Sequence, residues 1–452
     1  MTRFSIKYYS LLFFAVVLAS ACKKDPKNPE PTPASHIGDA TKYDASIAIN
    51  WINQFRDIAK TQPLNPPRAS RVYAYVSIAL YESVVDGIKG NKSLQGQLNG
   101  FPLNSIPSNN DSLDYGIVVN EALLTIAKCD TIIPSLSSQN LMNIESLHAQ
   151  FLATKTGVVA DSIIAKSKAR GILVAKAIMK YAATDNFLTV KTLSYIVPPR
   201  DAAHPWYWEP TDASHLNPAE PFWGQIRPFV MDSSAQFEIP QNIMFSLDTS
   251  SAFGHQALEV YNTVNNRTPA QNDIVFWWRD ASGTQTPAGH WMGILQYVIH
   301  QKKFKLDKAA ELYALTGIST AEAFIACWKS KYKFNLLRPE TYINAYINAG
   351  WTTGQGADPT PPFPEYPSGH SVCSGSADRA LTNYLGTVAF TDSVNFVSFG
   401  YTPRTFTSFT AAADEAGMSR IYGGIHFMEA IQSGLVEGRN IGQHVTDKIK
   451  FK

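Results

Sequence analysis

The chain has 452 residues, of which 45% are hydrophobic and 17% are charged, with 39 Lys and Arg against 37 Asp and Glu. The formal net charge of +2 provides no basic excess for phosphate backbones, so a nucleic-acid partner is not expected. About 410 residues remain after the N-terminal region, which is enough chain to bury a large hydrophobic core.

The first 22 residues have the pattern of an export signal. Arg3 and Lys7 form a short basic start, an apolar run follows, and the small residues Ala19-Ser20-Ala21 precede Cys22. This resembles a bacterial lipoprotein signal, in which cleavage before Cys22 leaves that cysteine to carry the lipid. A plain secretory signal with an incidental cysteine is the alternative.

The next segment, residues 23–40, is charged and rich in proline, as expected of an extended tether. We therefore expect an exported protein that meets a membrane only through the lipid on Cys22. Lys23, directly after that cysteine, is compatible with the outer membrane.

From residue 41 onward, apolar residues recur mostly at helical spacing and strand-like alternation is scarce. Helices are predicted at 68–88, 113–130, 136–155, 159–183, 252–265, 289–303, 319–337, 370–386 and 425–447. The expected fold is all-α: a single large domain of packed helical bundles over 41–452, with a polar site between helices. No segment after the signal is long and apolar enough to predict a membrane helix.

Two long loops are predicted, at 92–112 and 190–232. The second is rich in proline and tryptophan. Long ordered loops in a compact domain are often functional, so we expect 190–232 to wrap the helical bundle and to shape the entrance of a site.

The first of three polar motifs is Lys331-x6-Arg338-Pro339. Seven residues make two helical turns, so both cations can project from one face, and Pro339 predicts the end of that helix. Arg has a planar fork that matches phosphate-like oxygens, while Lys has a compact charge. Taken alone, the motif is also typical of a solvated cationic face that includes Lys329 and Lys333.

The second motif, Pro367-Ser368-Gly369-His370, predicts a loop that enters a helix. A helix N-terminus offers free amides and the positive end of the helix dipole to an anion. Gly369 permits close approach of the backbone to a ligand, Ser368 can donate a hydroxyl, and His370 can transfer a proton near neutral pH. An ordinary capped helix start is the alternative.

The third motif is Ser419-Arg420-x3-Gly424-x-His426. A spacing of six does not suit one helical face, so a turn at Gly423-Gly424 is predicted to bring His426 back towards Arg420. A lone histidine is more often a packed core residue than a ligand. The arginine and the glycine turn favour a ligand here.

In combination, the three motifs resemble the superfamily that joins type-2 phosphatidic acid phosphatases, bacterial acid phosphatases and vanadium-dependent haloperoxidases. Trp328 and Phe363 stand where the haloperoxidases have aromatic residues beside the halide side of the pocket, although core filling is the simpler interpretation. Upstream stretches also resemble bacterial haloperoxidases, namely 71–82, 207–211, 218–224 and 286–291. The resemblance covers nearly all of the chain after residue 40 and is closest to bacterial vanadium iodo- and bromoperoxidases.

The resemblance implies vanadate as the cofactor, with hydrogen peroxide and a halide, iodide or bromide, as substrates that yield hypohalous acid. It implies that His426 is the vanadium ligand and that the vanadate oxygens are bound by Lys331, Arg338, Ser368, Gly369 and Arg420. It further implies a halide pocket at Trp328 and Phe363, and a catalytic part at about 319–447 in which the catalytic residues are Lys331, His370 and His426.

One position departs from the superfamily pattern, because many members have an aspartate four residues after the last histidine and this chain has Ala430. A ligating histidine normally has an acceptor for its second ring nitrogen. Glu429 is expected to point to another face, so a backbone carbonyl or another residue must serve. The departure weakens the alternative of an acid phosphatase, in which His426 is the nucleophile. A non-catalytic glycan-binding lipoprotein is a third alternative, suggested by the anchor and the many aromatic residues.

Overall fold

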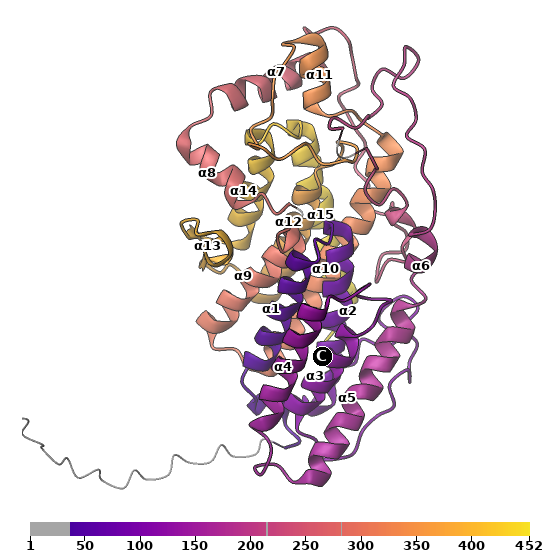
Figure 1. Ribbon diagram of the computed structural model, residues 1–452, viewed down its shortest axis with the longest axis vertical. Helices are drawn as coiled ribbons and strands as arrows, with labels where there is room; N and C mark the ends of the chain where they lie inside the picture. Colours follow the sequence, from indigo (N-terminus) through magenta and orange to yellow (C-terminus); the bar gives the residue numbers. More distant parts are fainter. Residues whose placement is uncertain (1–36, 214–215, 282) are drawn as a thin grey trace, which may run out of the picture. The chain divides into compact units, whose positions relative to one another are not determined.

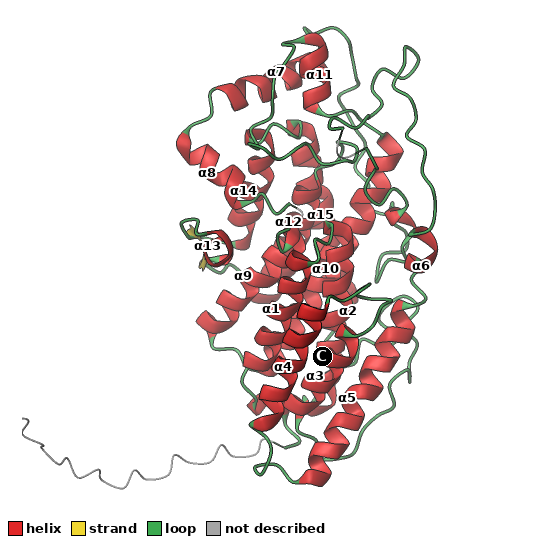
Figure 2. Ribbon diagram, viewed as in Figure 1, coloured by secondary structure: helices red, strands yellow, loops and turns green. Residues whose placement is uncertain are grey.

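The computed structural model describes residues 37–213, 216–281 and 283–452, which fold almost entirely as helices (Figures 1 and 2). The predicted signal, Cys22 and the tether up to residue 36 lie outside the described residues. The first part of the described chain forms α1 (Ser46–Thr61), α2 (Pro66–Val84), α3 (Tyr115–Ala127), α4 (Ser138–Ala153), α5 (Asp161–Ala182) and α6 (Phe187–Val190).

The remaining elements include the only two strands assigned in the described residues. The helices are α7 (Ala252–Asn265), α8 (Pro269–Trp277), α9 (Thr286–Lys302), α10 (Leu306–Phe334), α11 (Pro339–Tyr346), α12 (Gly369–Leu385), α13 (Val394–Phe399), α14 (Phe409–Tyr422) and α15 (Met428–Lys448). The strands β1 (Phe390–Asp392) and β2 (Arg404–Phe406) pair antiparallel, with Asp392 opposite Arg404. Short 3-10 helices lie at Ala40–Lys42, Val85–Gly87 and Trp223–Gln225.

The predicted all-α class is confirmed, and all nine predicted segments fall on helices. The largest difference is at 319–337, because α10 already begins at Leu306 and ends at Phe334. From Ala309 to the middle of the helix it is buried on every side, so this part has no solvent-exposed face to mark a helical period in the sequence.

Helix α10 lies at the centre of the molecule, where it packs against α2 on one side and α12 and α15 on the other. Helices α12 and α15 approach each other closely. A Cβ at Gly438 of α15 would lie 2.2 Å from the backbone oxygen of Val372 in α12, so a larger residue would separate the two helices. A Cβ at Gly434 would likewise lie 2.9 Å from the Ser371 side chain, so the first turn of α12 lies beside the first half of α15.

The long segment 190–232 is mostly without regular structure, as predicted, and it braces the link between α10 and α11. The backbone N–H of Trp208 donates to Asn335 at 2.8 Å, and that of Leu337 donates to Trp206 at 2.8 Å. These bonds hold the link that carries Arg338.

Residues 37–40, the described end of the predicted tether, pack against the helical unit. The Gly38 amide donates to the Leu113 carbonyl at 2.9 Å, and Ala40 is buried at the start of the first 3-10 helix. Among the described helices, none has both the length and the apolar composition needed to cross a membrane.

Candidate active site

The first motif adopts a different local structure from the one predicted. Helix α10 ends at Phe334, and Asn335 follows in the left-handed region with φ of 47°. Arg338 is the N-cap of α11, and Pro339 is the first residue of that helix. The expectation of one helix that carries both cations and ends at Pro339 is therefore wrong. Proline suits the first helical position because no intrahelical bond needs its missing N–H.

The second motif forms the predicted helix start. Ser368 is the N-cap of α12, and its hydroxyl accepts from the Ser371 amide at 3.4 Å. The Ser368 amide itself donates to the Ala430 carbonyl, which ties this turn to α15. Among the described atoms, none makes a hydrogen bond with the buried Nε2 of His370.

The third motif forms the predicted turn. Helix α14 ends at Tyr422, and Gly424 has φ of 76°. A Cβ at Gly424 would also lie 2.9 Å from the Trp351 ring, so both the backbone conformation and the space require glycine. Helix α15 begins at Met428 rather than at 425, which leaves His426 on the turn.

Residues of the second and third motifs line one cavity of about 450 Å³. Its wall includes Ala219 of the long loop, which was predicted to shape the entrance of a site. The wall also includes the predicted residues Trp328, Phe363, Gly369, His370, Arg420 and His426. Lys331, Arg338 and Ser368 are fully buried directly behind this wall. The Arg338 guanidinium lies 3.2 Å from His426 Nε2, and the Lys331 amine donates to the Pro367 carbonyl at 2.6 Å. The structure thus brings all the predicted site residues of the three motifs together.

The predicted halide residues form an aromatic wall beside the cations. The Trp328 and Phe363 ring centroids are 4.9 Å apart. The Phe363 ring centroid lies 5.0 Å from the Lys331 amine and 4.8 Å from the Arg338 guanidinium carbon. One side of the cavity is therefore apolar, and the adjoining side is positively charged.

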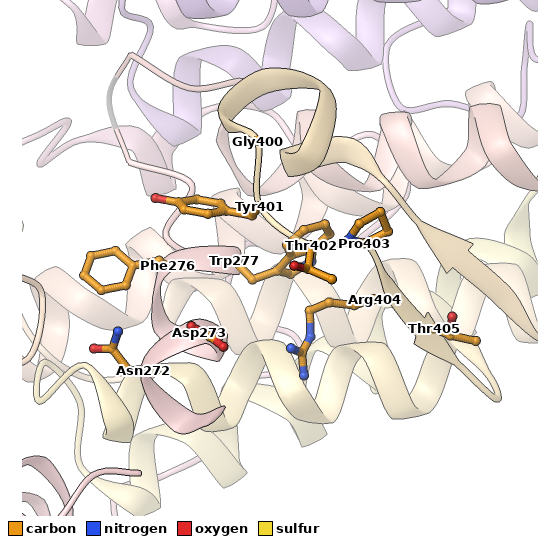
Figure 3. Close-up of a pocket in the computed structure, with 10 residues that line it drawn as sticks. All are labelled: Asn272, Asp273, Phe276, Trp277, Gly400, Tyr401, Thr402, Pro403, Arg404 and Thr405. Atoms are coloured by element: carbon orange, nitrogen blue, oxygen red, sulfur yellow. The ribbon is translucent and has the colours of Figure 1, made fainter. Parts of the chain in front are cut away.

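A second pocket, of about 820 Å³, is larger and lies elsewhere (Figure 3). It is formed by α8 and the segment Gly400–Thr405, and Phe276 and Tyr401 are among the residues that line it. None of the residues that line it belongs to the three motifs.

The three cations of the smaller cavity are held by neutral groups. Lys331 donates to the carbonyls of Pro364, Glu365 and Pro367, and Arg338 donates to those of Phe363, Pro361 and Ile425. Arg420 donates to the Trp278 carbonyl and the Ser419 hydroxyl. Within the described parts of the chain, none of the three has a carboxylate ion-pair partner, although each is at most 1% exposed.

This arrangement fits a tetrahedral oxyanion such as vanadate or phosphate. Buried charges without a counter-ion are costly, and an anion beside all three cations would supply one. The free nitrogen of His370 and the amides at the start of α12 add groups that can bind its oxygens.

The fold and the sequence of this chain are similar to those of known proteins. The fold is similar to the crystal structure of the first bacterial vanadium-dependent iodoperoxidase, with a TM-score of 0.82 and 34% identity, over 90% of this chain and 97% of that one. The chain belongs to the vanadium-dependent haloperoxidases.

Other comparisons agree with this membership of the haloperoxidase family. Residues 311–451 match the family profile of the VCPO second helical-bundle domain. The vanadium chloroperoxidase of Curvularia inaequalis is 25% identical over 227 residues, which is 41% of this chain and 37% of that protein's length. The holo-type structure of a bacterial vanadium-dependent chloroperoxidase has a TM-score of 0.62 at 15% identity, over 85% of this chain and 92% of that one, a likeness of fold alone.

Burial changes the protonation of this haloperoxidase's polar groups. It lowers the pKa of Lys331 to about 8 and the pKa of Arg338 and of Arg420 to about 10. Burial and the nearby Arg338 charge also hold the pKa of His426 well below its usual range, and burial with Arg420 does the same for the pKa of His370. Both imidazoles are therefore neutral at neutral pH.

The haloperoxidase contains an acceptor for His426 that the sequence analysis did not find. An oxygen of Glu365 lies 2.9 Å from His426 Nδ1 and also accepts from the Phe427 amide at 2.9 Å. Glu365 thus takes the place of the acceptor missing at Ala430, whereas Glu429 accepts from the amides of residues 242 and 243, as its predicted different orientation requires. A proton held on Nδ1 leaves Nε2 as an acceptor, and in this structure Nε2 faces the Arg338 guanidinium at 3.2 Å.

The environment of Glu365 links it to the same cations. Burial raises the pKa of its carboxyl group to about 7, against the opposing charges of Lys331 and Arg338. The only local signal in the sequence was its position two residues before the second motif.

Proposed function

We propose that this haloperoxidase uses vanadate to oxidise a halide, iodide or bromide, with hydrogen peroxide, giving hypohalous acid. The observation that carries the proposal is the set of three buried cations, without carboxylate partners, around a histidine oriented by Glu365. The 34% identity to a bacterial iodoperoxidase supports iodide as the first halide to test.

The proposed roles follow from the contacts of each side chain. When bound, vanadate would supply a Lewis-acidic centre at which peroxide becomes reactive towards halide. His426 Nε2 would hold the vanadium, while Arg338 and Arg420 donate to the oxygens with the Ser368 hydroxyl and the Gly369 amide. Because the Lys331 amine already donates to three carbonyls, it would exchange at least one of them for an oxygen of the ligand.

His370 is the proposed proton carrier. Its ring is neutral and lines the cavity, and its Nε2 has no protein partner among the described residues. It can therefore accept a proton from peroxide and return it when the oxidised halide leaves. Trp328 and Phe363 would exclude water from the adjoining side, where the halide approaches.

One observation favours an acid phosphatase as a second candidate. The contact between Glu365 and His426 would also orient a nucleophilic histidine, with His370 as the acid for the leaving alcohol. The objection based on Ala430 therefore loses its force, and activity must separate the two functions.

The deciding experiment uses the purified full-length chain, loaded with orthovanadate and freed of excess. Oxidation of iodide, bromide and chloride by hydrogen peroxide is measured beside hydrolysis of p-nitrophenyl phosphate by the vanadate-free protein. We expect vanadate-dependent oxidation in the order iodide, bromide, chloride. Phosphate release without halide oxidation would replace the peroxidase with the phosphatase. Neither activity, together with binding of soluble oligosaccharide, would favour a glycan-binding protein.

A further inference from the structure

A second buried polar cluster lies behind the active-site cavity. His290, on α9, has its Nδ1 2.9 Å from an oxygen of Asp280 and its Nε2 2.8 Å from an oxygen of Asp392. All three side chains are at most 2% exposed. None of the three motifs includes these residues.

The hydrogen-bond chemistry sets the charge of this cluster. A neutral imidazole has one N–H, whereas an ionised carboxylate can only accept. The cluster therefore holds either an imidazolium between two carboxylates or a neutral ring with one protonated carboxyl, and its net charge is −1 in both cases. Although burial acts to lower it, the two carboxylates raise the pKa of His290 to about 10, which favours the imidazolium.

The cluster is connected to the active site through residues 277–280. The indole ring of Trp278 stacks on His290, with centroids 4.5 Å apart and planes at 23°, and the indole N–H of Trp277 donates to Asp392 at 3.0 Å. The carbonyl of the same Trp278 accepts from Arg420 at 2.7 Å. Asp280 lines the cavity, and its charge acts to raise the pKa of Arg420.

The same segment also meets the proposed proton carrier. The His370 ring interacts with the backbone of Trp278 and of Arg279. Segment 277–280 thus contacts both Arg420 and His370. On its core side, this segment packs on the ring of His290.

We propose that His290, held by Asp392, is a positioning residue for the oxyanion site: it fixes segment 277–280 so that Arg420 and His370 point at the ligand. Opposite charges alternate from the core to the cavity in the order Asp392, His290, Asp280 and Arg420. Removing the imidazolium leaves two buried carboxylates facing each other, and the segment must then move or take up a proton. The inference rests on the proposed function only in taking the ligand to be an oxyanion.

The test measures oxyanion affinity, not turnover alone. Equilibrium dialysis of the full-length protein with orthovanadate, and separately with inorganic phosphate, is carried out for wild type, His290→Gln and Asp392→Asn. Asp273→Asn is the control, since Asp273 is an exposed carboxylate in the other pocket (Figure 3). Thermal unfolding and circular dichroism establish that each variant is folded.

We expect His290→Gln to weaken oxyanion binding by about tenfold to a hundredfold, the range typical of outer partners of metal ligands. Asp392→Asn keeps the shape of the side chain and the histidine ring, so its loss should be smaller, and Asp273→Asn should bind as wild type does. Where vanadate-loaded variants turn over, kcat for halide oxidation should fall more than KM for halide rises.

The outcomes separate this inference from the proposed function. A folded His290→Gln protein with wild-type affinity for both anions would overturn the inference and leave the peroxidase intact. If His290→Gln does not fold, wild-type affinity in folded Asp392→Asn would overturn it instead. Weakened phosphate binding in the variants, with no halide oxidation by wild type, would reject the peroxidase and support the positioning role.

Discussion

The two pockets of this haloperoxidase differ in whether their cationic side chains have ion-pair partners. The pocket in Figure 3 is the larger, at about 820 Å³ against about 450 Å³, but its Arg404 forms a two-bond ion pair with Glu415. In the smaller cavity, buried Lys331, Arg338 and Arg420 are bonded mainly to backbone carbonyls. Cations left without a counter-ion mark an anion site more reliably than volume does.

The largest difference in effect between changes in the two pockets is expected when His426, the proposed vanadium-binding residue, is removed. His426→Ala is expected to abolish vanadate retention and to lower halide oxidation by about a thousandfold or more, because no other group can take its place. Tyr401→Ala, in the larger pocket, should leave both within about twofold. Vanadate bound after gel filtration and the steady-state rate are the measurements. Full turnover in His426→Ala would refute the site assignment.

Arg420 and Arg404 differ in that only Arg404 has a salt-bridge partner among the described residues. Arg420→Ala should weaken vanadate binding by about a hundredfold, since it removes a buried donor to the ligand. The same change removes a buried charge that has no salt bridge among the described residues, but it also takes a positive charge from the neighbourhood of buried Asp280. These two effects oppose each other, so the unfolding free energy of the vanadate-free protein should change by no more than about 2 kcal/mol.

Arg404→Ala is the matched variant, and it should affect stability without affecting vanadate binding. Loss of a partly exposed ion pair is expected to cost at most about 1 kcal/mol of unfolding free energy, with vanadate affinity unchanged within a few-fold. Thermal unfolding with and without vanadate measures both quantities. Equal losses of affinity in the two variants would show that the pockets do not differ as argued.

A smaller effect is expected at the carboxylate that orients His426. Glu365→Gln keeps the shape of the side chain but removes its charge, so vanadate affinity should fall by about tenfold to a hundredfold. Glu429→Gln is the control, because its carboxylate lies three residues after His426 and bonds to other backbone amides. Unchanged affinity in Glu365→Gln would mean that the histidine needs no charged acceptor.

The sequence predicted those parts of the site that depend on local signals. Ser368 at a helix N-terminus and the turn at Gly424 follow from capping and from backbone freedom, which act within a few residues. The link before Arg338 was not predicted correctly, because Pro339 suits both the end of one helix and the start of the next.

The remaining parts depend on tertiary contacts that have no local signal. Glu365 meets His426 across 61 positions of the chain, and Asp392 meets His290 across 102. A carboxylate or a histidine in a sequence has many possible partners, and only the packing of α9, α12 and α15 selects one. Motifs therefore indicated which groups bind the ligand, while the groups that orient them required the structure.

A buried carboxyl group on α15 lies outside the lining of both pockets. Glu437 of α15 is 1% exposed, and in the described structure neither of its side-chain oxygens has a hydrogen-bond partner. Burial, with a contribution from Glu238, raises the pKa of its carboxyl group to about 8, while Lys331 acts in the opposite direction. The folded state therefore keeps a proton that the unfolded chain releases near the ordinary pKa of 4.5.

This difference in protonation between the folded and unfolded states makes the unfolding free energy depend on pH. Stability should fall as the pH rises from about 4.5 to about 8, by at most about 1.4 kcal/mol per pH unit for this one group. Glu437→Gln removes that proton release, so its melting temperature should exceed that of wild type by more at pH 9 than at pH 5. Asp447→Asn, an exposed change on the same helix, should shift both values equally. The same gain in melting temperature at both pH values would show that packing, not ionisation, accounts for the effect of Glu437.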